Sequence, residues 1–182
     1  MKHIKIKLIL APTLIGAACT AILAFFHHIT APLAEETARK SAVLAAQHVL
    51  PDGLPQPVQT NLNGVACFVS LDDDGRLLAI ALEGVAPKGY GGPIRLMAGF
   101  TADGMVHNFQ ILEAGGETPG LGSKIKSDKF RNRLVPRPVS ASWKLKKDGG
   151  TVDAITAATI SSRAALEALR DAIAKYKTAT SK

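Results

Sequence analysis

Residues 153–176 read DAITAATISSRAALEALRDAIAKY and hold the clearest structural element of this 182-residue chain. Large apolar side chains recur there three or four residues apart: Leu166, Leu169, Ile173 and Tyr176. This spacing predicts an amphipathic helix from about Ser161 to Tyr176, with one face packed on a core. The rest of the fold is therefore expected to supply a partner for that face.

The head of this helix carries several hydroxyl groups. Ser161 and Ser162 are N-cap candidates, and Thr159 lies just before them. A hydroxyl here is most often a cap, yet a helix N-terminus also has free N–H groups and a positive dipole end that stabilise a phosphate. The small Ala157 and Ala158 would leave room for a bulky group beside Thr159.

Upstream, alternating and β-branched segments predict two hairpins, each closed by a turn with Asp and Gly. We expect strands at 65–71 and 77–82 around the turn 72–75, strands at 94–100 and 105–112 around 101–104, a short helix near 128–134 and another strand at 141–145. Together with the last helix, these elements predict one α+β domain with an antiparallel sheet and flanking helices, spanning residues 59–182.

A long apolar segment precedes this domain. No charged side chain occurs from Leu8 to Phe26, about 19 residues, close to the roughly 20 that a helix needs to cross a bilayer core. Lysines precede the segment and no Lys or Arg follows until Arg39, which predicts an inside N-terminus (1–7), a transmembrane helix (8–27) and an outside remainder. A cleaved signal peptide is the alternative, but FFHH at 25–28 is a poor cleavage site.

Between the anchor and the domain, residues 28–58 are expected to form a stalk helix and a proline-rich linker. The net charge of +7 is dispersed and not interleaved with aromatic residues, so an anionic lipid or cofactor is a better partner than nucleic acid. Cys19 and Cys67 are expected to stay apart, and the triple Asp at 72–74 is interpreted as a solvated turn, so no metal site is predicted.

A second glycine-rich segment stands out at 115–124, GGETPGLGSK, with four glycines and a proline. An ordinary surface loop is one interpretation. Glycines also let backbone N–H groups approach a ligand closely, and Lys124 supplies a positive charge that suits a phosphate or an electron-rich ring edge. The residues alone therefore indicate an anion or cofactor loop without naming the ligand.

These segments resemble the FMN-binding domain shared by the G subunit of the Rnf (Rsx) electron transport complex and the C subunit of the sodium-pumping NADH:quinone reductase. Residues 117–122 with Lys124 match the family's E-T-P-G-L-G-x-K loop, and 89–92 match its G-Y-[SG]-G element. The attachment motif D-x-x-[ST]-G-A-T is matched by Asp153, Thr156, Ala158 and Thr159. Ala157 stands where the family has Gly, and is expected to be strained if the backbone there requires a positive φ.

The resemblance implies FMN esterified through its phosphate to Thr159, and a redox subunit that relays electrons but is not catalytic alone. The residues it implies around the cofactor are Tyr90, Glu117, Thr118, Gly120, Leu121, Lys124, Thr156 and Ala158. Asp153 and Thr156 would be recognised by a flavin transferase that uses FAD and Mg²⁺. Partners would be the other membrane and redox subunits of a ferredoxin:NAD oxidoreductase in a bacterial inner membrane, with the C-terminal domain on the periplasmic side.

Other functions remain open. The chain length favours the Rnf subunit over its sodium-pump homologue, which is typically longer. A non-redox membrane-tethered scaffold would use the same fold, and Ala157 is the residue that favours it. A secreted hydrolase is weakly indicated, because His107 is the one histidine in the main domain and has no neighbouring nucleophile or metal-ligand pattern.

Overall fold

The computed structural model describes residues 2–181, with side chains described for 9–10, 12–31 and 40–181. The chain divides between Ser41 and Ala42 into two units. The first unit belongs to helix α1 (Lys2–Val49), in which Pro12–Ala31 is an exposed stretch of 20 residues with mean hydropathy 1.7. This stretch is long and apolar enough to cross a membrane, and overlaps the predicted span 8–27. The lysines that predicted its orientation lie outside the described side chains.

The helix α1 continues without a break through the segment where a separate stalk helix was expected. Its few polar side chains are satisfied locally. The hydroxyls of Thr13, Thr20 and Thr30 each donate to the carbonyl four residues earlier, at 2.8 Å. Such bonds satisfy a hydroxyl that has no water to bond with, so these threonines are compatible with an apolar environment.

The second unit is built on a six-stranded antiparallel sheet whose strands follow sequence order. The strands are β1 (Val58–Leu62), β2 (Val65–Leu71), β3 (Leu77–Ala86), β4 (Ile94–Thr101), β5 (Met105–Ala114) and β6 (Arg137–Pro138). The helical elements after them are η1 (Gly122–Lys126), α2 (Asp128–Arg131), η2 (Lys146–Asp148) and α3 (Thr159–Thr180). The α+β prediction is confirmed, and both predicted hairpins join into one sheet.

Three local predictions differ from the structure. The sequence pattern did not predict the strand β1, which begins at Val58 and otherwise lies inside the expected domain 59–182. The predicted strand at 141–145 is wrong: apart from a parallel bridge between Leu145 and Val152, this segment has no strand partner. Its apolar residues Trp143 and Leu145 are buried as core residues of an irregular segment, so burial alone produced a strand-like pattern. The predicted helix near 128–134 is a single turn.

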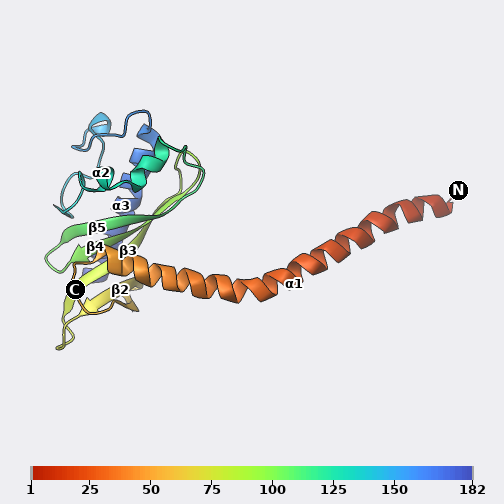
Figure 1. Cartoon of the computed structure of the whole chain (residues 1–182), viewed down its shortest axis with the longest axis horizontal. Helices are drawn as coiled ribbons and strands as arrows, with labels where there is room; N and C mark the ends of the chain where they lie inside the picture. The colour runs from red at the N-terminus through yellow and green to blue at the C-terminus, as the bar shows by residue number, and fades with distance from the viewer. Residues whose placement is uncertain (1, 182) are drawn as a thin grey trace. The chain divides into compact units, whose positions relative to one another are not determined.

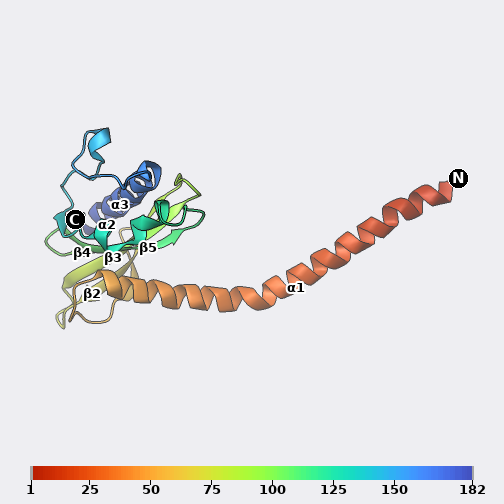
Figure 2. The same cartoon turned by 45° about the horizontal axis from the view of Figure 1, so that its top comes forward.

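The sheet separates two hydrophobic cores, because successive side chains of a strand point to opposite faces. Along β3, Ile80 and Leu82 enter the larger core under α3, whereas Ala79 and Ala81 face the last turns of α1, residues 42–49. In Figure 1 and in the turned view of Figure 2, α3, drawn in blue, covers one face of the sheet. The alternation therefore gives a layered unit of helix, sheet and helix.

Close packing of α3 on the sheet depends on one glycine of β3. A Cβ atom at Gly84 would lie 2.0 Å from the carbonyl oxygen of Ala168 in α3. This oxygen belongs to the helix backbone and cannot rotate out of the way, as the end of a flexible side chain can. At the C-terminus of α3, the Asn63 side chain donates to the carbonyls of Thr178 and Ala179 at 3.2 and 3.3 Å, which are among the last carbonyls of the helix.

We expect Gly84→Ala to lower the free energy of unfolding by about 2–3 kcal/mol, because the added methyl forces α3 away from the sheet. Chemical unfolding of the full chain in a non-ionic detergent, followed by circular dichroism, measures this loss. Gly115→Ala is the matched control, since a Cβ atom there would meet nothing within 4 Å. Equal losses for the two variants would contradict the proposed contact.

Candidate functional site

The loop that follows β5 and the N-terminus of α3 meet at a pocket of about 340 Å³. Its lining comes from three separate segments of the chain: Tyr90; Glu117, Thr118, Leu121 and Gly122; and residues 157–161. The two motifs that stood out in the sequence thus form one site, although the lining residues of one motif are more than 30 positions from those of the other. The volume is within the usual range for small-molecule sites, roughly 300–1,000 Å³.

The carboxylate of Glu117 holds the three segments of this site together. Oε1 accepts a hydrogen bond from the backbone N–H of Tyr90 at 3.1 Å, and Oε2 accepts one from the hydroxyl of Ser161 at 2.5 Å. The side chain is only 8% exposed. A buried carboxylate is costly unless donors compensate it, so these bonds hold both loops in place against α3.

Two glycine positions around Glu117 are explained by close approach. A Cβ at Gly122 would lie 2.0 Å from Oε2 of Glu117, and a Cβ at Gly91 would lie 2.1 Å from the backbone of Gly116. Gly122 lines the pocket, and the absence of a side chain there also leaves space for the Glu117 carboxylate. Gly120 has a different reason, a φ of 73° at the third position of the turn Thr118–Leu121. Proline before a glycine with positive φ is typical of a type II turn.

The N-terminus of α3 has no side-chain cap. The N-cap residue is Ala158, and Thr159 is the first residue of the helix. The predicted caps Ser161 and Ser162 are therefore wrong, because both serines lie inside the first turn of the helix. Ser161 donates to Glu117, while Ser162 donates to the carbonyl of Ala158 at 2.9 Å and accepts from the N–H of Ile155 at 3.0 Å. The first N–H groups of α3 thus face the pocket region without a capping side chain.

The backbone at Ala157 has φ 61°, in the left-handed region. Glycine enters this region freely, whereas a Cβ atom makes it unfavourable by about 1–2 kcal/mol. Among the described residues other than glycine, only Asn63 shares a positive φ, and asparagine tolerates it better. The strain that we expected for an alanine in place of the family glycine is therefore present, two residues before Thr159.

Exposed apolar side chains surround the pocket. Tyr90 is 65% exposed, Ile160 49% and Leu121 40%. The sequence analysis did not name Ile160 as a site residue. Its position outside the apolar stripe of α3 is the signal that could have indicated an exposed apolar contact. A hydroxyl at an uncapped helix N-terminus, beside these apolar groups, suits a ligand that joins a phosphate to a flat apolar ring.

Some of the residues implied by the resemblance lie outside this pocket. Lys124 and Thr156 line a neighbouring pocket of about 240 Å³, together with Lys129 and Arg133. Asp153 is exposed and accepts a hydrogen bond from Nζ of Lys146 at 2.9 Å. Among the described residues, no group of three or more His, Cys, Asp or Glu side chains is arranged to hold a metal ion.

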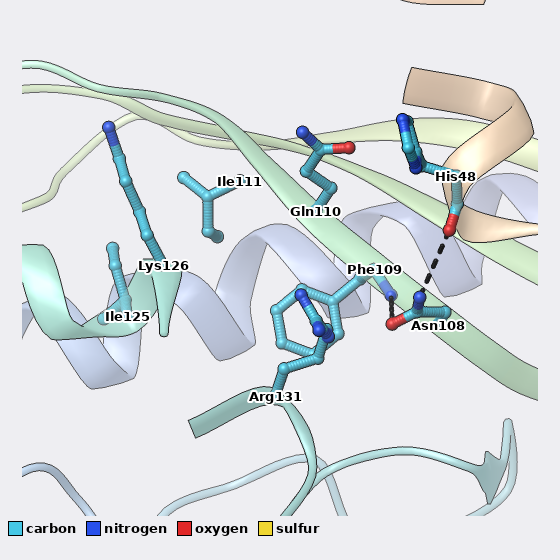
Figure 3. Close-up of a pocket in the computed structure, with 8 residues that line it drawn as sticks. All are labelled: His48, Asn108, Phe109, Gln110, Ile111, Ile125, Lys126 and Arg131. Carbon is cyan, nitrogen blue, oxygen red and sulfur yellow. Dashed lines mark hydrogen bonds between the residues drawn. The ribbon is translucent and has the colours of Figure 1, made fainter. Parts of the chain in front are cut away.

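A larger pocket of about 460 Å³ lies along β5 and contains none of the motif residues (Figure 3). His48, Lys126 and Arg131 contribute basic groups to it, while the Asn108 amide donates to the carbonyl of His48 at 3.2 Å. Arg131 is paired with Asp128 at 2.6 Å. The larger pocket is not the candidate site, because the Thr159 hydroxyl and the uncapped N-terminus of α3 lie at the pocket of about 340 Å³.

We expect Glu117→Ala and Ser161→Ala each to lower the free energy of unfolding by about 1.5–3 kcal/mol, the range for hydrogen bonds to charged groups. The double variant should lose clearly less free energy of unfolding than the two single variants lose together, because each substitution removes the same hydrogen bond. Chemical unfolding of the four proteins of this cycle gives the coupling energy. Strictly additive losses would mean that the bond contributes nothing.

We expect Ala157→Gly to raise the free energy of unfolding by about 0.5–1 kcal/mol, because relief of strain exceeds the added entropy of the unfolded chain. The control is Ala154→Gly in the same segment, where φ is not positive and the same change should destabilise. Thermal unfolding followed by circular dichroism compares them. A loss of stability in both variants would argue against strain at position 157.

Comparison with known proteins identifies the family of the chain. Residues 89–174 match the FMN-binding domain family. The G subunit of the ion-translocating oxidoreductase complex of Erwinia tasmaniensis is 34% identical over 173 residues, covering 85% of this chain and 81% of the relative. The corresponding G subunits of Vibrio cholerae (32%, the same coverage) and Shewanella baltica (30%, covering 95% and 90%) are similar.

Among solved structures, a crystal structure of Shewanella oneidensis NqrC resembles the chain with a TM-score of 0.46 and 21% identity, covering 58% of this chain and 54% of that one. The family assignment rests on the curated relatives, which align with most of the chain at 30–34% identity. The chain therefore belongs to the family of the ion-translocating oxidoreductase complex G subunits, and its second unit contains an FMN-binding domain.

Proposed function

We propose that this chain is a membrane-anchored electron-relay subunit that carries FMN covalently bound through its phosphate to Thr159. The observation that carries the proposal is the position of Thr159: it is the first residue of an uncapped helix, in the pocket that Glu117, Thr118 and Leu121 also line. The relatives are named as subunits of an ion-translocating oxidoreductase complex, which supports a redox role.

The residues present fit a phosphate ester at this position. The first N–H groups of α3 have no side-chain cap, and the positive end of the helix dipole favours a negative charge. Ala157 and Ala158 place only methyl groups beside the hydroxyl. When FAD serves as donor, the Thr159 oxygen bonds to the FMN phosphorus, the bond to AMP breaks, and the hydroxyl proton passes to a base of the transferase.

The same pocket fits the ring of the cofactor. Tyr90, Leu121 and Ile160 expose large apolar surfaces at its rim, which a flavin ring would cover in part. When bound, the flavin would supply one- and two-electron chemistry, and these side chains would hold its ring in position. Gly120, Lys124 and Thr156 are proposed as further contacts from the neighbouring turn and pocket.

Attachment requires access for a flavin transferase. Asp153 and Thr156 are both exposed, so the motif residues that the transferase would recognise are at the surface. The Lys146 ion pair of Asp153 is also exposed, at 61% for each side chain, and is easily opened. These exposed residues support modification of the folded domain, and we propose that the transferase uses FAD and Mg²⁺.

The helix α1 is proposed as a retained single-pass anchor in a bacterial cytoplasmic membrane. The Pro12–Ala31 stretch has the length and composition to span it, and Lys2, Lys5 and Lys7 on one side favour an inside N-terminus. The FMN-binding domain would then stand on the outer side, next to other membrane and redox subunits of a ferredoxin:NAD oxidoreductase.

A non-redox scaffold is the second candidate, because the strained Ala157 could reduce flavin attachment. Co-expression with an active flavin transferase, followed by denaturing electrophoresis under ultraviolet light, separates the two. We expect a fluorescent band and a mass increase of one FMN less one water. Thr159→Val should abolish both, because it removes the attachment oxygen and keeps the shape.

Thr178→Val, the same substitution near the other end of α3, is the matched control and should keep the fluorescence. Absence of fluorescence in the unsubstituted chain, with the transferase shown to modify a second substrate, would favour the scaffold. Fluorescence retained in Thr159→Val would place the bond on another residue.

A further inference from the structure

A second concave surface lies away from the flavin pocket, between residues 139–144 and α3. We call it the α3 groove; its volume is about 360 Å³. Its floor is apolar, formed in part by Val139, Trp143 and Ile173. An apolar floor that stays open to solvent is costly, so the surface is suited to cover by a ligand.

The rim of the α3 groove is basic. Arg170 and Lys177 lie two helical turns apart on one stripe of α3, and Lys144 faces them from the irregular segment. All three side chains are exposed, and none of them has an ion pair with a described residue. Three cations on a single groove, without a paired carboxylate among them, indicate an anionic ligand.

One carboxylate lies nearby but is already engaged. A smaller pocket of about 240 Å³ shares Trp143, Lys144 and Arg170 with the groove and also contains Asp148. Arg163 donates two hydrogen bonds to this carboxylate, at 2.7 and 2.8 Å, and the pairing lowers the pKa of Asp148. Asp148 therefore compensates Arg163 first, and acts on Lys144 and Arg170 only through weaker, longer-range attraction.

Trp143 provides an independent indication of a ligand. The residue is 4% exposed and lines both pockets, yet its indole Nε1 has no hydrogen-bond acceptor in the described part of the chain. A buried donor without a partner is rare and costs about 1–3 kcal/mol. Because protein atoms cover the nitrogen itself, an oxygen of a bound group would supply the acceptor after a small local shift uncovers it.

These features together define the chemistry of the occupant. Lysine and arginine donors suit phosphate oxygens, whereas the apolar floor suits hydrocarbon. A free inorganic phosphate would use the rim and leave the floor uncovered. An anionic phospholipid uses both, and the α1 stretch Pro12–Ala31 would keep the domain tethered beside a bilayer.

We propose that the α3 groove binds an anionic phospholipid, with Lys144, Arg170 and Lys177 around its headgroup phosphate and the floor against its glycerol and upper acyl carbons. This binding gives the FMN-binding domain a second attachment to the membrane, in addition to α1. The proposal concerns a different surface from the flavin pocket and does not depend on flavin attachment.

Trp143 is the only tryptophan of the chain, so its fluorescence reports on the groove directly. The purified full chain in a non-ionic detergent is titrated with short-chain phosphatidylglycerol, phosphatidylcholine of the same chain length, inorganic phosphate, or a short acidic peptide. We expect phosphatidylglycerol to change the emission and raise the thermal midpoint at a concentration at least about tenfold below the other three.

Arg170→Gln with Lys177→Gln should raise the phosphatidylglycerol concentration required by at least about tenfold. Lys129→Gln with Arg133→Gln is the matched control: it removes one lysine and one arginine charge from the other basic pocket and should leave the response unchanged. Circular dichroism checks that each variant is folded. Trp143→Phe, followed by the thermal midpoint, should weaken the lipid effect because the ring stays and the N–H is lost.

Any of four results would overturn the proposal. An equal response to phosphatidylcholine would remove the role of the anionic headgroup. An equal response to inorganic phosphate would make the groove a site for free anions. A response to an acidic peptide and none to phosphatidylglycerol would make it a protein-docking surface. Absence of any change in emission and thermal midpoint would leave the groove without a lipid ligand.

Discussion

The structure around the candidate site depends on the hydrogen bonds of the buried Glu117 carboxylate, because a buried charge is stable only where donors compensate it. Its two oxygens bond to the N–H of Tyr90 and the hydroxyl of Ser161, which come from different segments of the chain. The glycines at 91 and 122 follow from this arrangement, because side chains there would occupy the space of Gly116 and of the carboxylate. Loop conformation, glycine placement and the first turn of α3 therefore form one coupled unit.

The sheet provides the rigid support on which that unit rests. Its strands bury Ile80, Leu82 and Phe100 under α3, while small residues on the opposite face admit the last turns of α1. Since α3 is held along its length against the sheet, the position of Thr159 at its first residue is determined by the core rather than by local preference. A site for a cofactor needs such support to keep its geometry.

Departures from ordinary capping and backbone preferences occur mainly near the candidate flavin site. Ala158 is a poor N-cap residue, and Ala157 has an unfavourable φ for alanine. Departures of this kind concentrate at functional sites, where a free helix end and a tight turn are useful to a ligand. The buried Trp143 indole without an acceptor is a similar departure at the α3 groove, and these departures support our proposals that both surfaces bind ligands.

The sequence by itself determined the α+β class, the hairpins, the last helix and the two motifs, because these depend on local periodicity, turn residues and short matched patterns. It predicted that Thr159 stands at a helix head and that Ala157 would be strained under a positive φ. It did not predict the bond from Ser161 to Glu117, the role of Gly122, or the irregular burial of residues 141–145. Those features join residues tens of positions apart, and only tertiary packing decides which donor meets a buried carboxylate and which backbone segments touch.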